Sequence, residues 1–324
     1  MRAPEFWQTG GPIVRALAPL GKLYAAATAW RLKHTTPVYV AVPVISIGNL
    51  TVGGTGKTPI VRDLVQRCKD LGHRPAVVLR GYGGRLTGPV RVDADAHTVL
   101  DVGDEALLHA RDGTTWVARK RSDGARQAVA EGATVILLDD AHQHASLHKD
   151  CALVVVDGAT GFGNHHTLPA GPLREDVRAG LARADRVILM GSDKTDLIDR
   201  LPAQLEVIRG HLDPTADAVH LRGRKVVAFA GLGRPDKFFN ALVSVGAKVI
   251  AAHPFDDHHL YQPADIQPIL DEAFELDALP VTTEKDAMRL SPDQRQQVNV
   301  LRVAVRWENS PAIESLLKDV LTRR

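Results

Sequence analysis

The sequence predicts an α/β fold: a mostly parallel sheet with helices on both faces, followed by a second, smaller α/β domain. Short apolar, β-branched runs alternate with helical patterns along most of the chain, which is typical of parallel sheets. Around residues 201–224 this alternation fades into a polar stretch containing Pro and Asp, and a second α/β series follows. The 324 residues suffice for one large or two ordinary domains.

The expected elements run in order along the chain. In the first series the predicted strands span residues 38–47, 75–79, 114–117, 134–138, 152–156 and 186–190. The clearest helix covers 59–71, because its apolar residues repeat on one face. In the second series we expect strands at 225–230, 248–252, 280–283 and 298–305, and helices at 236–245 and 264–274. A last helix should start at Ser310 as N-cap, with Pro311 in its first turn, and run to residue 322.

We place the domain boundary near residue 220. The prediction therefore has three parts: a basic amphipathic segment of residues 1–35, a first domain of residues 36–220, and a smaller C-terminal α/β domain of residues 221–324. Because ligands of open α/β sheets bind outside the carboxyl ends of the strands, the functional residues are expected in the loops that follow the strands.

The stretch GNLTVGGTGKT, residues 48–58, lies between the first strand and the strong helix. A Gly-rich turn in this position directs backbone N–H groups at a phosphate chain, helped by the helix dipole. It predicts a P-loop, although Thr51 stands where the usual pattern begins with Gly. Lys57 would reach the β- and γ-phosphates, and Thr58 would give its hydroxyl to Mg²⁺. The predicted nucleotide-binding residues are Thr51, Val52, Gly53, Gly54, Thr55, Gly56, Lys57 and Thr58.

Acidic residues follow other predicted strands. The run ATVILLDD ends in Asp139 and Asp140, where a nucleoside triphosphatase holds Mg²⁺; side chains alternate along a strand, so which of the two contacts the metal stays open. Asp104 opens a helix and is either an ordinary first-turn acid, the interpretation favoured from the residues alone, or a carboxylate that activates a hydroxyl.

Other polar stretches are ambiguous. HPFDDHHLY, residues 253–261, fits a catalytic cluster and a surface loop equally well. The histidines of AHQHASLHKD do not have the spacing of a zinc site. RGYGG and LPAGPLRE each carry an arginine that could meet an anion, with connecting loops as the default. We interpret Glu284, Lys285 and Asp286 of TTEKDAMRL as a solvated turn.

Bulk properties exclude several classes of protein. A net charge of +2 gives no broad basic field for nucleic acid. The two cysteines are too few for a disulfide framework and favour a reducing compartment. We see no run of about 20 apolar residues and no signal-peptide pattern, so we expect a cytoplasmic protein.

The first 35 residues differ from the rest. They carry Arg2, Arg15, Lys22, Arg31 and Lys33 against Glu5 alone, five minus one, or +4. Apolar residues gather on one side of a helical projection, and Pro19 predicts two short helices or one kinked helix. From these residues alone, a helix packed on its own domain and a helix on an anionic membrane surface are equally supported.

Over essentially its whole length the chain resembles the tetraacyldisaccharide 4′-kinases, the lipid A 4′-kinases of Gram-negative bacteria. The resemblance rests on motifs in one order: MRAPEFW, SIGNLTVGGTGKTP, RGYGG, VGDEALL, LDDAHQH, LPAGPLRE, FDDHH and VTTEKDA. The family's loop also reads TVGGTGKT, so Thr51 is a family trait. The family usually has LDDGFQH, so Ala141 and His142 are departures whose effect the sequence does not reveal.

The resemblance implies transfer of the γ-phosphate of ATP to the 4′-hydroxyl of a tetraacylated disaccharide 1-phosphate, with Mg²⁺. Lys57 and Thr58 would hold triphosphate and metal, with Asp139 and Asp140 on the metal side. It also implies an Asp–His catalytic pair, here Asp104 with His258, or with His259 as the alternative. The pair spans both domains, so their closure would assemble the site.

The implied acceptor lies in a membrane. The expected location is therefore peripheral, on the cytoplasmic face of the inner membrane, with the basic N-terminal segment as docking element. No nucleic acid and no obligate protein partner are inferred. Two rival interpretations are a P-loop switch protein that hydrolyses nucleotide to control a partner, and a soluble small-molecule kinase, which would have little use for the N-terminal segment.

Overall fold

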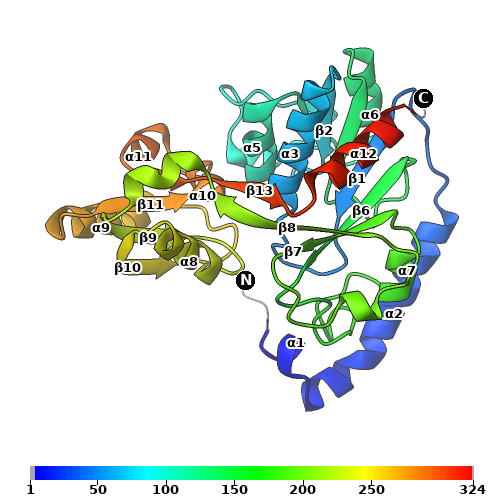
Figure 1. The fold of residues 1–324 in the computed structure, drawn as a ribbon, viewed down its shortest axis with the longest axis horizontal. Coiled ribbons are helices and arrows are strands. Elements are labelled where there is room, and N and C mark those ends of the chain that lie inside the picture. The colour runs from blue at the N-terminus through cyan, green and yellow to red at the C-terminus, as the bar shows by residue number, and fades with distance from the viewer. Residues whose placement is uncertain (1–3, 323–324) are drawn as a thin grey trace.

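The computed structural model describes residues 4–322, which form two sheets (Figure 1). A nine-stranded sheet has the order β13-β8-β7-β6-β1-β5-β2-β4-β3, and a four-stranded sheet the order β10-β9-β11-β12. We call the part of the chain built on the first sheet the larger unit, and the part built on the second sheet the smaller unit. The predicted fold class, a mostly parallel sheet of the P-loop type with a smaller α/β part, is confirmed.

The larger sheet places the ends of its central strands together. Its strands are β1 (Val44–Gly48), β2 (Pro75–Leu79), β3 (Val90–Arg91), β4 (Thr115–Val117), β5 (Val135–Asp139), β6 (Cys151–Asp157), β7 (Arg186–Met190), β8 (Val207–Pro214) and β13 (Val303–Trp307). β1 lies parallel between β5 and β6, with Ile47 opposite Asp139. The loop after β1 and the acids after β5 therefore meet at one edge.

Helices cover both faces of this sheet. They are α3 (Lys57–Asp70), α4 (Val99–Val102), α5 (Asp104–Asp112), α6 (Arg121–Ala130), α7 (Val177–Leu181) and α12 (Ser310–Leu321), with a 3₁₀ turn η1 (Ile198–Arg200). Ile45 and Ile47 of β1 pack in one buried cluster with Leu64 of α3, whereas Val44 packs in another with Ala125 of α6. Because side chains alternate along a strand, β1 is buried on both faces.

The smaller unit is a parallel sheet with helices. It contains β9 (Lys225–Ala230), α8 (Asp236–Ser244), β10 (Lys248–Pro254), α9 (Pro263–Glu275), β11 (Leu279–Thr283), α10 (Glu284–Ala287), α11 (Pro292–Gln296) and β12 (Asn299–Leu301), and the 3₁₀ helix η2 (Ala216–Leu221) precedes it. Figure 1 shows β8 and β13 extending toward this unit, and they pair antiparallel. The chain thus leaves the larger sheet at the end of β8 and returns along β13.

Three sequence-based expectations at this level were wrong. The strand predicted at 38–47 begins only at Val44, since Pro37 and Pro43 cannot donate to a strand ladder. The strand predicted at 298–305 is two strands in different sheets, because local β-propensity does not specify which sheet offers a partner. The N-cap of α12 is Asn309, whose side chain accepts a hydrogen bond from Ala312 N, and Ser310 is already helical.

The C-terminal end belongs with the larger unit. Ile313 and Leu317 of α12 lie in the buried cluster that includes α3, whereas Leu221 of η2 lies in the cluster around β9. We therefore propose that the smaller domain runs from about residue 215 to about residue 302, instead of from 221 to 324.

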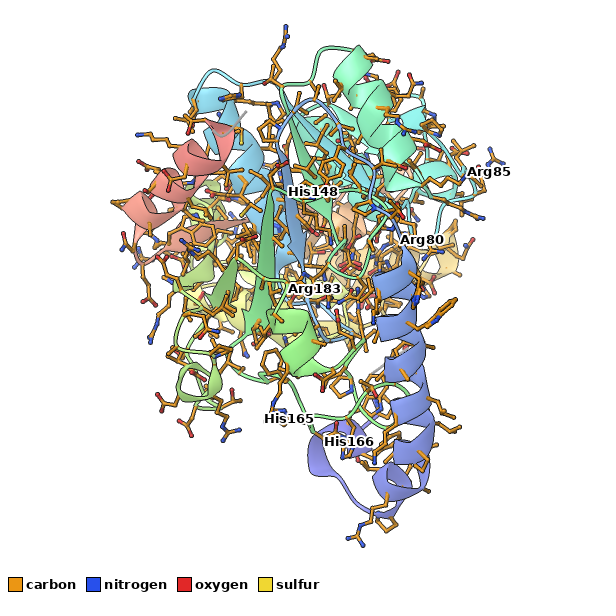
Figure 2. The ribbon with its side chains drawn as sticks, turned by 90° about the vertical axis from the view of Figure 1, so that its right-hand side faces the viewer. Arg80, Arg85, His148, His165, His166 and Arg183 are labelled. Carbon is orange, nitrogen blue, oxygen red and sulfur yellow. The ribbon has the colours of Figure 1, made fainter. Side chains whose placement is uncertain are left out.

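The N-terminal segment forms α1 (Phe6–Thr9) and α2 (Pro12–His34). The interruption lies at Gly10 and Gly11, and α2 continues through Pro19, where two short helices or one kinked helix were expected, so a break at Pro19 does not occur. Figure 2 shows α2 lengthwise along one edge of the molecule. None of the helices within residues 4–322 is both long and apolar enough to cross a membrane.

Only a narrow stripe of α2 is buried. Val14, Gly21 and Thr28 form this stripe, and Gly21 O accepts a hydrogen bond from Thr167 Oγ1 at 2.6 Å. Large apolar side chains of α2 face outwards instead: Ile13, Leu20, Leu23, Tyr24 and Trp30, each 40–67% exposed. Arg2, which the charge count includes, lies outside the described residues. These exposed apolar side chains are therefore not used to pack α2 on its own unit.

Candidate active site

The loop after β1 borders open space. A Cβ built at Gly53 or Gly54 would meet no atom within 4 Å. Gly53 and Gly56 have φ values of +109° and +84°, a region that favours glycine because it has no Cβ. α3 begins at Lys57, two residues earlier than predicted, and its N-terminus directs N–H groups toward the loop. This geometry provides a cradle for an anionic phosphate chain.

The first part of the loop is already engaged. Thr51 forms an isolated antiparallel bridge with Leu173, and Val52 N–H donates to Pro172 O at 2.8 Å. The amide of Val52, predicted to bind nucleotide, is thus occupied in this structure. Thr51 pairs as a strand residue does, a conformation that suits a β-branched side chain and does not require glycine.

Asp140 connects two cations at the loop. Its Oδ1 lies 3.4 Å from Lys57 Nζ, and Arg174 Nη1 donates to both carboxylate oxygens at 2.8 and 2.9 Å. Burial by itself would raise the pKa of Asp140, but the charges of Lys57 and Arg174 hold that pKa well below its usual range. Two cations on one carboxylate leave excess positive charge, which favours a bound phosphate.

Asp139 offers an unused ligand atom. Its side chain is buried, and its Oδ2 lies 2.9 Å from His109 Nε2. Its Oδ1 is buried and has no hydrogen-bond partner among the described residues. Such an oxygen beside Asp140, together with the hydroxyl of Thr58, fits Mg²⁺, which prefers oxygen ligands. No three acidic, His or Cys side chains form a metal cage within residues 4–322, so the ion would need phosphate oxygens as well.

Asp104 and His258 meet between the two units although they are 154 positions apart in the sequence. His258 Nδ1 lies 3.1 Å from Asp104 Oδ2. His259 Nε2 lies instead 2.9 Å from Asp265 Oδ2, within the smaller unit. The ring of Tyr82 stands 5.4 Å from the ring of His258, centroid to centroid. The structure thus brings His258, and not His259, to Asp104.

The Asp104 carboxylate is buried and fully engaged. Its Oδ1 accepts from Glu105 N at 2.8 Å, and its Oδ2 accepts from Arg289 Nε at 2.8 Å. Burial would raise the pKa of Asp104, but the hydrogen bond with His258 and the charges of Lys285 and Arg289 hold that pKa well below its usual range. Asp104 is therefore a carboxylate at neutral pH, and the cations Lys285 and Arg289 that lower its pKa come from the smaller unit.

The segment after β11 was interpreted as a solvated turn, and this was wrong. Asp286 is fully buried and accepts from Tyr261 Oη at 2.9 Å and from Arg289 Nη1 at 2.8 Å. Lys285 Nζ donates to Glu105 Oε1 across the two units at 3.0 Å. Burial would lower the pKa of Lys285, but Glu105 and Asp104 raise it to about 12. This segment is part of the site.

A sequence signal for this segment existed. The acids follow a short apolar strand, as Asp139 and Asp140 do, so they stand at the carboxyl edge of a parallel sheet. The missing information was that this edge faces the larger unit. Arg62 of α3 also joins this segment to the larger unit, with its Nη1 donating to Glu284 Oε2 at 2.8 Å.

Sequence reasoning also missed Arg121, the first residue of α6. Its side chain is buried, and its Nε has no hydrogen-bond partner among the described residues. Burial lowers the pKa of Arg121 to about 10, while the charges of Asp140 and Asp139 act in the opposite direction. A buried guanidinium near these acids is suited to bind an anion. The only sequence signal was its place after the strand at 115–117.

The departures at Ala141 and His142 lie inside the larger unit. His142 is buried, and its Nε2 donates to Gly180 O at 2.9 Å. A Cβ built at Gly48 would come within 2.6 Å of His142 Cβ, so Gly48 makes room for this residue. Burial and nearby cations lower the pKa of His142 to about 3. His142 is thus a neutral core residue and not a contact of the smaller unit.

The units also touch at the loop itself. Asp157, the last residue of β6, is buried and forms ion pairs with Arg234 and Lys237 of the smaller unit. Arg234 Nη2 also donates to Gly54 O in the phosphate loop at 3.3 Å. The smaller unit therefore contacts the larger one both at Asp104 and beside the phosphate cradle.

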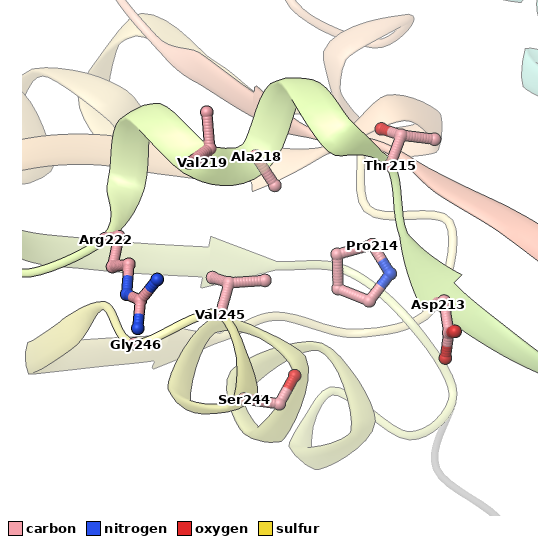
Figure 3. A pocket seen from close by; sticks show the side chains of 9 residues that line it. All are labelled: Asp213, Pro214, Thr215, Ala218, Val219, Arg222, Ser244, Val245 and Gly246. Carbon is pink, nitrogen blue, oxygen red and sulfur yellow. The ribbon is translucent and has the colours of Figure 1, made fainter.

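Figure 3 shows a pocket of about 460 Å³ away from these residues. It lies where the chain enters the smaller unit, and its walls come from the end of β8, from η2 and from the turn after α8. None of the predicted site residues lines it. The convergent charges, and not this cavity, mark the candidate site.

Comparisons with known proteins agree with the geometry. The model of the LpxK family, tetraacyldisaccharide-1-P 4′-kinase, matches residues 13–322. The tetraacyldisaccharide 4′-kinase of Rhodospirillum rubrum is 50% identical, over 100% of this chain and 99% of its own length. The enzyme of Rhodospirillum centenum is 48% identical, over 99% and 97%.

A solved structure has the same fold. LpxK from Aquifex aeolicus, determined in complex with ATP, is 26% identical and superposes with a TM-score of 0.78 over 95% of this chain and 99% of its own. A family model that matches nearly the whole chain and relatives at half identity leave one conclusion. The chain belongs to the tetraacyldisaccharide 4′-kinase family.

Proposed function

We propose that this protein transfers the γ-phosphoryl group of ATP to the 4′-hydroxyl of tetraacyldisaccharide 1-phosphate, a step of lipid A biosynthesis. The observation that carries the proposal is the 3.1 Å contact of His258 Nδ1 with Asp104 Oδ2, in a chain that also has an open phosphate cradle at Gly53 and Gly54. A switch protein needs the cradle but has no use for such a pair. A kinase needs both.

In this proposal the loop and Lys57 hold the triphosphate, and Arg121 meets phosphoryl oxygens. The Asp104–His258 pair takes the proton of the 4′-hydroxyl, whose oxygen forms the new bond to the γ-phosphorus while ADP leaves. We assign the proton to the pair as one unit, because the two side chains lie within hydrogen-bond distance of each other. Asp104 orients the imidazole of His258, and the imidazole lies between Asp104 and the 4′-hydroxyl of the acceptor.

Thr58, Asp139 and Asp140 are proposed to hold Mg²⁺. When bound, the ion neutralises charge on the β- and γ-phosphates. The chain's own contribution is to keep Asp140 ionised between Lys57 and Arg174 and to leave Asp139 Oδ1 free of other hydrogen bonds.

α2 is the proposed contact with the membrane. Its exposed apolar side chains include Leu23 and Trp30, which are 67% and 66% exposed, and Arg15, Lys22 and Lys33 are exposed on the same helix. Apolar groups would enter the headgroup boundary, and cations would meet anionic lipid. The protein would then be peripheral at the cytoplasmic face of the inner membrane, where an acylated acceptor resides.

The activity test uses purified protein with γ-labelled ATP, Mg²⁺ and the disaccharide 1-phosphate lipid in detergent. We expect label in the lipid at its 4′-position. A parallel reaction contains the deacylated disaccharide, which a soluble sugar kinase would accept equally well. Hydrolysis of ATP with no labelled lipid would overturn the proposal and favour the switch protein.

The membrane test uses vesicles that contain anionic lipid. The double substitution Leu23→Glu and Trp30→Glu should reduce vesicle binding by about 10-fold or more, since about 1 kcal/mol or more is lost per buried apolar side chain. Phe274→Glu is the matched control, because Phe274 is 88% exposed on the smaller unit. Equal loss for both variants would contradict a docking role of α2.

A further inference from the structure

Arg289 connects the two units through the carboxylate of Asp104. It follows α10 in the smaller unit, its side chain is 1% exposed, and it reaches Asp104 of the larger unit through Nε at 2.8 Å and through Nη2. A guanidinium presents its donors in a rigid fork, so two bonds to one oxygen fix both the distance and the direction of the carboxylate.

The other end of this guanidinium is held rigidly. Arg289 Nη1 donates to Asp286 Oδ1 at 2.8 Å and to Gly231 O at 3.0 Å. Asp286 Oδ1 also accepts from Gly231 N at 3.0 Å, and Asp286 Oδ2 accepts from Thr283 Oγ1 at 2.6 Å. Arg289 therefore cannot shift without disturbing several buried hydrogen bonds of the smaller unit.

The backbone of His258 is bonded to the same carbonyl group as Arg289. Gly231 O accepts hydrogen bonds from Arg289 Nη1 and from His258 N, the latter at 3.3 Å. His258 has a φ of +60°, a left-handed conformation that is uncommon for residues other than glycine. Arg289 is thus bonded to one member of the pair directly and to the backbone of the other member through Gly231.

We propose that Arg289 is the positioning residue of the Asp104–His258 pair, joining the two units at Asp104 and setting the geometry in which this carboxylate meets the imidazole. The inference rests on the proposed role of the pair. Arg289 and His258 both belong to the smaller unit, so Arg289 can hold the Asp104 carboxylate only where the two units are in contact. Closure and proton transfer are therefore coupled at one atom, Asp104 Oδ2.

The charges around Asp104 give the expected pH effect. His258, Lys285 and Arg289 face it from the smaller unit, and Glu105 is its neighbour on α5. Removing the Arg289 charge takes away one cation that favours the deprotonated pair. The acid limb of kcat/KM should therefore move to higher pH, because the pair must be deprotonated to act as a base.

The experiment compares Arg289→Met, Arg289→Lys and Arg295→Met in the lipid phosphorylation assay across pH. Arg295 is the matched control, because within residues 4–322 its hydrogen bonds go to the carbonyls of Ala287, Met288 and Leu290 in the same segment and to no carboxylate. We expect Arg289→Met to lower kcat by about 10- to 100-fold and to leave the KM for ATP unchanged. The acid limb of its kcat/KM profile should shift to higher pH by about one unit. In Arg289→Lys the acid limb of kcat/KM should return to its wild-type pH, because lysine keeps the positive charge. Only part of kcat should return, because lysine lacks the forked guanidinium.

The outcomes separate this inference from the proposed function. If the wild-type protein labels no lipid, the proposed function fails; if Asp104→Ala and His258→Ala leave transfer intact, the function stands but the pair has no catalytic role, and the inference is overturned. If those variants abolish transfer while Arg289→Met behaves like Arg295→Met, with lowered stability and an unmoved limb, only the inference is overturned. Should Arg289→Met fail to fold, Arg289→Lys decides, since an unchanged kcat in that variant excludes positioning by the fork.

Discussion

The phosphate-binding half of the site and the half around Asp104 are built in opposite ways. Gly53 to Lys57 come from one continuous turn between β1 and α3, and Asp140 follows the neighbouring strand in the same sheet. Asp104, His258 and Arg289 come from two units and are joined through a single carboxylate oxygen. The first half therefore exists in the larger unit by itself, whereas the second exists only when the units meet.

This difference teaches what each half can contribute. The backbone cradle and Lys57 belong to the larger unit, and the smaller unit reaches the cradle through Arg234, which donates to Gly54 O, so ATP affinity should depend less on closure than the Asp104–His258 pair does. A composite pair can act only after closure, which separates phosphate transfer to the acceptor from hydrolysis by water. Substitutions in the two halves should therefore have different kinetic signatures.

The largest effect is expected from Lys57→Ala. The cation lies between the loop and Asp140, and its loss removes the charge that binds the triphosphate in both the ground state and the transition state. Transfer should fall by at least about 10³-fold, and ATP binding should weaken as well, as measured by calorimetry. Lys69→Ala, at the other end of α3, is the control; wild-type ATP affinity in Lys57→Ala would contradict the assignment.

His258→Ala should be the next largest, with kcat lowered by about 10²- to 10⁴-fold. ATP affinity should be unchanged, because His258 belongs to the composite half. His259→Ala is the neighbouring control and should change kcat little, since His259 bonds Asp265 within the smaller unit. If His259→Ala were the more damaging change, the pairing seen here would not be the one used in catalysis.

The smallest effect concerns stability at His142, next to the phosphate half. Its pKa of about 3 in the folded protein lies below the ordinary value of 6.5, so the unfolded chain binds the proton more readily. The contribution of His142 to the free energy of unfolding is fully present above about pH 6.5. Below that pH it falls by about 1.36 kcal/mol per pH unit, so about 2 kcal/mol is lost at pH 5.

His142→Phe, which restores the residue usual in the family, should remove this part of the pH dependence. Urea unfolding of both proteins at pH 7 and pH 5 measures it, and the variant should lose less stability between the two. His148→Phe is the control, because His148 stacks on exposed Tyr39 and has no buried imidazole to protect. If wild type and His142→Phe lost equal stability between pH 7 and pH 5, the buried imidazole would not be the cause of this pH dependence.

The sequence anticipated the larger unit better than the composite half. The strand-loop-helix order identified the cradle and the acids after β5, because in a parallel sheet these signals are local and their common edge is fixed by topology. From the residues alone it left Asp104 and the stretch 253–261 ambiguous, it paired Asp104 with His258 or His259 only through the family resemblance, and it misread Lys285 and Asp286 as solvated. Burial of a charged turn depends on what packs against it, and no pattern within nine residues carries that information.

The sequence by itself determined the alternation of strands and helices and the phosphate cradle, since backbone geometry and glycine placement act over a few residues, and its motifs implied the type of reaction through the resemblance to a family. Only the tertiary structure decided that His258 and not His259 meets Asp104, that Arg289 joins both units, and that β13 returns to the larger sheet. The contacts of Asp104 with His258 and Arg289 span 154 and 185 positions of the chain, and they form because a buried charge must find an opposite charge or a hydrogen-bond donor wherever the fold supplies one.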